Sequence, residues 1–244
     1  MSLAGKRVLI TGGGTGVGAD LAAGYAQAGA EVVIAGRREA PLAAVAGGNI
    51  RAVTADVTDE ASVKALFEAA GPCDIVIANA GAASSAPLKH TSLADWNAML
   101  AVNLTGVFLT FREGLTRMNG WGRLIAVAST AGLKGYRYVA PYAAAKHGVV
   151  GLVRSLALEV AKGPVTVNAL CPGFLDTEMT DRSVANIRDK TGMSEDDARK
   201  TLAASNPQKR LIQPAEVTAA ALWLSGPGSE GINGQAIAIA GGEV

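Results

Sequence analysis

A tyrosine and a lysine stand four positions apart in this 244-residue chain, at Tyr142 and Lys146. Of the four tyrosines, only Tyr142 has a lysine at that distance, and both open an alanine-rich segment that is predicted to be a helix over 142–161. On a helix this spacing puts both side chains on one face. A phenol ionises near pH 10, but a neighbouring ammonium favours the phenolate and lowers the pKa. The pair therefore predicts a general acid or base that the lysine tunes.

A serine is placed to act on the same substrate oxygen. Ser129 ends the strand predicted at 123–128, thirteen residues before Tyr142. From a strand end its hydroxyl can reach the crevice and hydrogen-bond the oxygen to which Tyr142 transfers a proton. Each residue alone is most often an ordinary polar residue, so the prediction rests on the set.

A glycine-rich turn, Thr11 to Gly18 (TGGGTGVG), follows the first predicted strand and precedes a predicted helix. Glycines let the backbone approach a pyrophosphate closely, and the free N–H groups and the positive end of the helix dipole face the anion. The strand, turn and helix together predict a dinucleotide site. The alternative is a merely flexible turn.

The residues after the second predicted strand bear on the choice of coenzyme. A protein built for NAD normally offers a carboxylate to the adenosine ribose there, but this chain reads Ala35-Gly36-Arg37-Arg38. Without a carboxylate a 2′-phosphate is not repelled, and Arg37 can bind it, so NADP(H) is favoured and NAD(H) is possible. The alternative is two solvated arginines at a helix start. Asp56 and Val57 are candidates for the adenine edge, although Asp56 is equally suited to cap the helix starting near Asp59.

The elements that must position these residues alternate along the whole chain. Runs of Val, Ile and Ala with almost no polar alternation predict strands covered on both faces, and amphipathic runs between them predict helices. We therefore predict one Rossmann-type, doubly wound α/β domain over 1–244 with a seven-stranded parallel sheet. The predicted strands are 6–11, 31–35, 50–54, 74–78, 123–128, 165–169 and 236–240. The predicted helices are about 16–28, 39–46, 60–70, 93–117, 142–161 and 214–224.

One segment departs from this alternation. Twelve of the thirty residues from Asp181 to Arg210 are charged, against 18% for the chain. The segment lies between a strand end and the last helix, where a lid over the carboxyl-end crevice is expected. The alternative is a solvated helical excursion without a role.

The composition narrows the class of protein. A formal charge of +1 gives no excess for binding nucleic acid, and no run reaches the ~18 apolar residues that a membrane span needs. The first residues lead directly into a strand without an export leader, so we expect a cytoplasmic protein. Cys73 and Cys171 lack partners at metal-ligand spacing, so we expect buried thiols, no disulfide and no metal.

Taken together, these motifs resemble the short-chain dehydrogenase/reductase family over essentially the whole chain. The resemblance rests on the TGxxxGxG turn, Asn79-Ala80-Gly81, Asn103, Ser129, Tyr142-x-x-x-Lys146, and Pro172-Gly173 with Thr177. It implies hydride transfer between nicotinamide and a secondary alcohol or ketone, without a metal. Tyr142 is then the proton donor or acceptor, and Ser129 positions the substrate carbonyl. Lys146 binds the nicotinamide ribose and lowers the tyrosine pKa, and Asn103 holds a water in the proton relay.

The resemblance also implies the coenzyme contacts and a homotetramer. Asn79 and Gly81 line the adenosine ribose side, and the main chain after Pro172 with the Thr177 hydroxyl fixes the carboxamide. The full set of implied coenzyme residues is Gly12, Thr15, Gly16, Val17, Gly18, Arg37, Asp56, Val57, Asn79, Gly81, Tyr142, Lys146, Pro172, Gly173 and Thr177. One NADP-preferring version of the turn has a basic residue where this chain has Thr15, so the preference rests on Arg37 and the missing acid.

The residues expected around the substrate bear on its chemical class. The expected walls of the pocket, Ala131 to Leu133, Val139, Phe174 and Met179, are mostly apolar and suit an acyl chain. The segment 206–214 is similar to that of 3-oxoacyl-thioester and polyketide ketoreductases. The alternatives are another secondary alcohol or ketone, or a dinucleotide-binding sensor or scaffold that kept the fold and lost the chemistry. A serine hydrolase is disfavoured because neither His90 nor His147 lies in a suitable setting.

Overall fold

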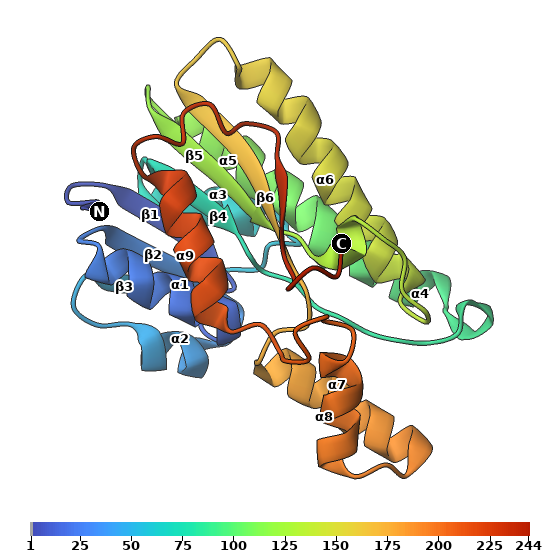
Figure 1. The fold of residues 1–244 in the computed structure, drawn as a ribbon. Helices are drawn as coiled ribbons and strands as arrows, with labels where there is room; N and C mark the ends of the chain where they lie inside the picture. The colour runs from blue at the N-terminus through green and yellow to red at the C-terminus, as the bar shows by residue number, and fades with distance from the viewer. Residues whose placement is uncertain (1) are drawn as a thin grey trace.

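The computed structural model describes residues 2–244 and contains one seven-stranded parallel sheet between two layers of helices (Figure 1). The strand order is β3-β2-β1-β4-β5-β6-β7, and every neighbouring pair is parallel. The chain winds outward first from β1 to β3 and then from β4 to β7, so the order reverses between β1 and β4, where doubly wound proteins bind their ligands. The strands are β1 (Arg7–Thr11), β2 (Glu31–Gly36), β3 (Ile50–Thr54), β4 (Ile75–Ala78), β5 (Gly122–Val127), β6 (Val165–Pro172) and β7 (Ala236–Ile239).

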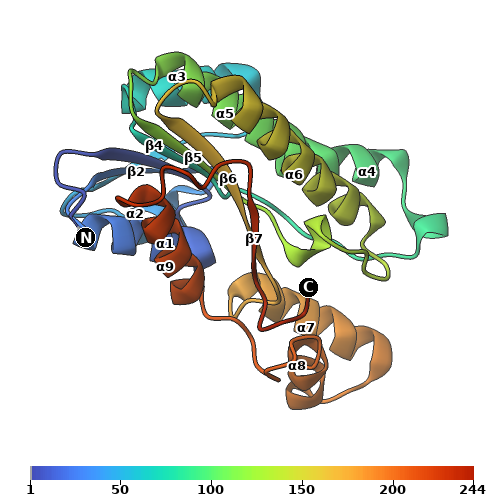
Figure 2. The ribbon, with the colours of Figure 1, turned by 45° about the horizontal axis from the view of Figure 1, so that its top comes forward.

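The strands contribute side chains to a core on each face of the sheet. In β1, for example, Leu9 belongs to one core and Val8 and Ile10 to the other, and all three are fully buried. This explains the absence of polar alternation in the strand sequences. Figure 2 shows α3, α5 and α6 along one face and α1, α2 and α9 along the other. The α-helices of these layers are α1 (Gly16–Gln27), α2 (Glu39–Val45), α3 (Glu60–Ala70), α4 (Leu93–Leu100), α5 (Gly106–Arg117), α6 (Ala140–Val160) and α9 (Pro214–Ser225).

The predicted helix over 93–117 is not one regular helix. A π-helical turn, η2 (Ala101–Thr105), separates α4 from α5. Such a turn accommodates an extra residue and is frequent at functional sites. Its middle residue, Asn103, is fully buried. β6 is also longer than predicted, because Leu170 to Pro172 continue the ladder to β7.

The charged segment forms two helices, α7 (Glu178–Thr191) and α8 (Glu195–Ala203), which lie apart from the two layers, beyond the end of β6 (Figure 1). Arg199 of α8 pairs with Asp181 of α7 at 2.7 Å. On the other side, Asn186 Nδ2 donates to Ser85 Oγ in the loop after β4, at 3.1 Å. The helices are therefore tied both to each other and to a loop of the main body.

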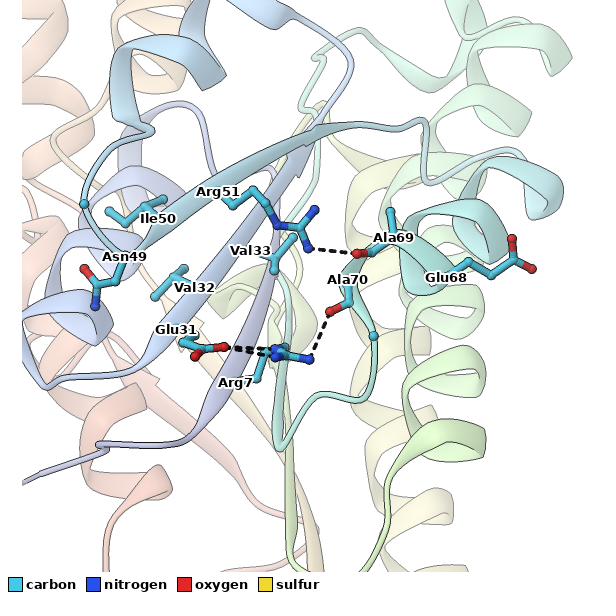
Figure 3. Close-up of a pocket in the computed structure, with 12 residues that line it drawn as sticks. Arg7, Glu31, Val32, Val33, Asn49, Ile50, Arg51, Glu68, Ala69 and Ala70 are labelled. Atoms are coloured by element: carbon cyan, nitrogen blue, oxygen red, sulfur yellow. Dashed lines mark hydrogen bonds and ion pairs between the residues drawn. The ribbon is translucent and has the colours of Figure 1, made fainter.

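A groove of about 460 Å³ opens at the opposite edge of the sheet, at the amino ends of β1, β2 and β3 (Figure 3). Its two arginines are already engaged: Arg51 Nη2 donates to the Ala69 carbonyl at 2.8 Å, and Arg7 pairs with Glu31 at 3.0 Å and reaches the Ala70 carbonyl at 3.5 Å. Ala69 and Ala70 are the last residues of α3, whose carbonyls have no partner within the helix. The groove is thus a helix-capping arrangement, away from the strand ends that carry the predicted chemistry.

Candidate active site

The glycine-rich turn is held in shape by Thr11 and Asn79 from the two central strands. Asn79 Nδ2 donates to the carbonyls of Thr11 (2.9 Å) and Gly12 (3.2 Å), and the Asn79 and Ala80 N–H groups both donate to Thr11 Oγ1 at 3.1 Å. These bonds direct the carbonyls of the turn toward the protein. The turn also requires glycine, because a Cβ at Gly18 would lie 2.0 Å from the Gly12 carbonyl oxygen.

The beginning of α1 is left open to an anion. Thr15 is the N-cap, but its side chain makes no capping hydrogen bond. The first N–H groups of a helix have no partner within it, so those of Gly16, Val17 and Gly18 are available to a ligand. Gly16, with φ of +52°, brings the backbone into this position without a side chain in the way. The residues present therefore fit a pyrophosphate.

Arg37 and Asp56 lie together at the ends of β2 and β3. The Arg37 guanidinium is 4.0 Å from the Asp56 carboxylate, and its side chain is 71% exposed. Burial alone would raise the pKa of Asp56. Two hydrogen bonds from Thr58 and the charge of Arg37 nevertheless hold this pKa below its usual value. Asp56 does not cap α3. The N-cap is Asp59, which accepts from the Ala61 N–H at 3.1 Å, so the capping alternative for Asp56 was wrong.

Three predicted catalytic side chains converge at the end of β5 and the start of α6. Ser129 follows β5 and accepts a hydrogen bond from the Ala131 N–H at 3.1 Å, and its hydroxyl is close enough to Tyr142 to lower the pKa of the phenol. The Lys146 ammonium lies 5.6 Å from the centre of the Tyr142 ring. It donates to the Val127 carbonyl at 2.8 Å. The Val127 carbonyl thus holds the lysine side chain in place. The sequence could not predict this contact, because every residue carries a main-chain carbonyl.

The electrostatics of the protein alone differ from the prediction. Burial raises the pKa of Tyr142, and the hydroxyl that lowers it is that of Ser129. Burial also lowers the pKa of Lys146 to about 8. The expected lowering of the tyrosine pKa by the lysine is therefore not seen in the protein by itself, because burial has the largest influence on the phenol and the ammonium donates to Val127.

Asn103 joins this group through the loop after β4. Its Nδ2 donates to the carbonyls of Ala82 (2.9 Å) and Met99 (3.1 Å), and its Oδ1 accepts from the Ala82 N–H at 3.3 Å. A Cβ at Gly81 would lie 2.8 Å from Asn103 Oδ1 and 3.9 Å from Lys146 Nζ. Gly81 thus lies beside both Asn103 and Lys146, although the resemblance implied the adenosine ribose side for Gly81 and the nicotinamide ribose for Lys146. The amide of Asn103 fixes the loop of Gly81.

The segment after β6 closes the other side of the glycine-rich turn. Pro172 ends β6, and the Gly173 N–H donates to the Ile239 carbonyl at 3.0 Å. Thr177 is the N-cap residue of α7 but makes no side-chain capping bond, which leaves its hydroxyl available. Its Cγ2 lies 3.3 Å from where a Cβ at Gly16 would stand, so the start of α7 meets the start of α1.

The two cysteines behave as predicted. Cys73 and Cys171 are buried and unpaired, and burial raises the pKa of their thiols to about 12 and about 11. Among residues 2–244 no three His, Cys, Asp or Glu side chains are grouped so that they could hold a metal ion. None of the helices in this range combines the length and apolar character of a membrane span.

Comparison with known proteins settles the family. The model of the short chain dehydrogenase family matches residues 6–188. The chain belongs to this family. The resemblance drawn from the motifs and the predicted doubly wound fold are both confirmed, and the chain is an oxidoreductase of the short-chain dehydrogenase type.

Its relatives in the family include reductases and dehydrogenases. The chain is 34% identical to the 3-oxoacyl-(acyl-carrier-protein) reductase FabG of Vibrio harveyi, over 99% of this chain and 98% of that one. It is 35% identical to the D-beta-hydroxybutyrate dehydrogenase of Cupriavidus necator, over 95% of each chain. The crystal structure of a single-site variant of actinorhodin polyketide ketoreductase with NADPH superposes with a TM-score of 0.90 at 33% identity, over 98% of this chain and 97% of that one.

Proposed function

We propose that this short-chain dehydrogenase transfers a hydride between a nicotinamide dinucleotide and a secondary alcohol or ketone. The observation that carries the proposal is the convergence of Ser129, Tyr142 and Lys146 at the same end of the parallel sheet as the open, glycine-lined start of α1. The coenzyme supplies or accepts the hydride when it is bound. Its pyrophosphate fits the N–H groups of Gly16 to Gly18.

The chain's own residues handle the proton. In the direction of reduction, Tyr142 donates the phenolic proton to the substrate oxygen and Ser129 donates a hydrogen bond to the same oxygen. The raised pKa of Tyr142 keeps the phenol protonated, so it serves as an acid until charge develops on the substrate oxygen. Lys146 is held by Val127 where its hydrogen bonds can reach a nicotinamide ribose. A water held near Asn103 completes the relay by which Tyr142 regains its proton.

We assign NADP(H) as the favoured coenzyme, because Arg37 is exposed and no carboxylate ends β2. The similar structure of the actinorhodin polyketide ketoreductase variant contains NADPH, which supports the assignment. Asp56, 4.0 Å from Arg37, holds the guanidinium beside the expected adenosine. Two further residues complete the coenzyme site. Asn79 holds the glycine-rich turn in shape, and Thr177 offers its hydroxyl to the coenzyme.

Replacing Arg37 by Asp is expected to reverse this preference. The variant loses charge-assisted hydrogen bonds to the 2′-phosphate and repels it, so the Kd for NADPH rises about ten- to hundredfold while that for NADH falls or stays the same. Fluorescence titration with each coenzyme measures both constants. Arg38→Gln is the matched control, since Arg38 is also exposed, and it should change neither by more than about twofold. Equal losses for both coenzymes would contradict the assignment.

As substrate we propose a 3-oxoacyl or 3-hydroxyacyl thioester. Two relatives are named for 3-oxoacyl-(acyl-carrier-protein) and polyketide ketoreduction, and the side chains beside Ser129 and after β6 are mostly apolar. The test is oxidation of NADPH, followed by its absorbance, with a panel of 3-oxoacyl thioesters, free ketones and hydroxy acids. Turnover confined to ketones without an acyl thioester would remove the substrate assignment. Coenzyme binding without turnover across the panel would indicate a sensor.

We also propose a cytoplasmic homotetramer. The exposed large apolar side chains include Phe108 on α5, Leu158 on α6 and Trp223 on α9, which are 42%, 80% and 49% exposed. Contact with further copies of the chain would bury these side chains, as closed symmetric assemblies do. Light scattering gives the mass in solution.

A further inference from the structure

Glu243 stands out as a buried carboxylate that the proposed reaction does not use. Its side chain is only 2% exposed although it follows the last strand by four residues. Burying a carboxylate is costly unless charges and hydrogen bonds compensate it, so a residue kept in this state is expected to hold something in place.

One carboxylate oxygen of Glu243 binds two side chains of the loop after Ser129. Glu243 Oε1 lies 3.1 Å from the Lys134 ammonium and 2.5 Å from the Tyr136 hydroxyl. Lys134 Nζ donates also to the Glu243 main-chain carbonyl at 3.2 Å. The Tyr136 hydroxyl is also 2.6 Å from Thr130 Oγ1. A phenol has one hydrogen, which the charged carboxylate attracts most strongly, so Thr130 is left to donate to Tyr136.

The chain of bonds therefore ends one residue from Ser129. Thr130 opens the short helix η3 (Thr130–Gly132), and Ser129 is its N-cap. The Leu133 and Lys134 N–H groups both donate to the Thr130 carbonyl, at 2.9 and 3.0 Å. Tyr136, through its hydroxyl, and Lys134, through its N–H group, are thus both bonded to Thr130, the chain neighbour of Ser129. Burial and the hydrogen bond to Glu243 raise the pKa of Tyr136, so the phenol stays a donor at neutral pH.

The other oxygen faces the segment after β6. Glu243 Oε2 is buried and has no hydrogen-bond partner among residues 2–244. It lies 3.1 Å from where a Cβ at Gly173 would stand, which places the carboxylate directly against the Pro172-Gly173 segment. Next to Gly173, Phe174 meets the Tyr136 ring edge-on, with the ring centres 6.2 Å apart. Glu243 thus lies between the loop that carries Ser129 and the segment that is proposed to fix the carboxamide.

We propose that Glu243 is a positioning residue that holds Ser129 in its working geometry. It acts through Tyr136 and Thr130 and does not touch the reacting atoms. This inference rests on the proposed function, since the geometry matters only if Ser129 holds the substrate oxygen.

The test is a double-mutant cycle on activity with Glu243→Ala and Ser129→Ala. Glu243→Ala alone should lower kcat/KM for the ketone about ten- to hundredfold, with the Kd of NADPH unchanged. In the Ser129→Ala background the same change should cost less than about threefold, because the group it positions is already gone. Glu243→Gln, which keeps an acceptor for Tyr136, should recover part of the loss. Glu68→Ala, at an exposed glutamate of α3, is the control.

Hydrogen exchange of the segment 129–136 gives a readout that needs no turnover. Glu243→Ala should speed exchange of these amides about tenfold and leave β1 and β4 unchanged. Tyr136→Phe, which removes only the hydroxyl link, should do the same if Glu243→Ala does not fold. If the wild type turns over no substrate but exchange rises, the proposed function fails and the tie through Glu243 stands. If the wild type is active, additive losses in the cycle, or unchanged exchange, overturn the inference alone.

Discussion

Tyr142→Phe is expected to abolish turnover while coenzyme binding persists. The substitution removes one oxygen, and with it the proton that the substrate oxygen needs. Loss of a positioned general acid lowers rates by about 10²- to 10⁴-fold. The ring itself stays, so α6 and the neighbouring Lys146 keep their packing. Initial rates of NADPH oxidation with the best ketone of the panel measure the loss, and fluorescence titration measures the Kd of NADPH.

Tyr138→Phe is the matched control for this experiment. Tyr138 is 60% exposed, lies four residues earlier and carries the same hydroxyl, so its loss should change kcat by less than about twofold. A Tyr142→Phe enzyme that retains more than about a tenth of the wild-type kcat would mean that another group, or solvent, supplies the proton. If instead both coenzyme binding and turnover disappear together, the defect lies in folding, and the melting temperature will show it.

The sheet could be predicted from sequence because its information is local. Each strand is a short apolar run that differs plainly from the amphipathic segments around it, and strands buried on both faces leave no alternation to misread. For α3 the predicted bounds agree with the structure at both ends. The glycine-rich turn could be predicted for the same reason. A Cβ at Gly18 would lie 2.0 Å from the Gly12 carbonyl oxygen, so only glycine is tolerated there.

The parts that could not be predicted depend on tertiary contacts. The π turn at Asn103 has the same residue types as an ordinary helix, and what distinguishes it is the hydrogen bonding of its amide to the loop of Ala82. The sign of the Tyr142 pKa shift was missed because spacing shows that a lysine is near but not how much water is lost. Glu243 gave no signal, since its partners are more than a hundred residues away in sequence.

Lys146→Met is expected to lower activity strongly and to change how stability depends on pH. Methionine keeps the length and apolar stem of lysine but cannot donate to Val127 or to a ribose. We expect kcat/KM to fall about 10²-fold or more, with a weaker affinity for NADPH, because two hydrogen bonds from a charged donor are lost. Kinetics and titration at one pH measure this part.

The expected change in how stability depends on pH follows from the burial of the Lys146 ammonium. Burial lowers the pKa of Lys146 to about 8 in the folded protein. In the unfolded chain it is about 10.4, so between these values the unfolded chain binds more protons. The free energy of unfolding of the wild type therefore rises with pH in this window, whereas below about pH 8 the folded protein carries the full cost of the buried charge. Lys146→Met has no such titration.

The difference in unfolding free energy, wild type minus Lys146→Met, should accordingly increase by about 2 kcal/mol between about pH 7.5 and pH 10. Urea titrations of both proteins at several pH values measure it, and the subtraction removes groups that titrate alike in both. Lys162→Met, at an exposed lysine just after α6, should show a flat difference. If the difference in unfolding free energy between wild type and Lys146→Met also stays constant with pH, water reaches the ammonium. The hydrogen bond to the Val127 carbonyl then does not hold Lys146 in a dry site.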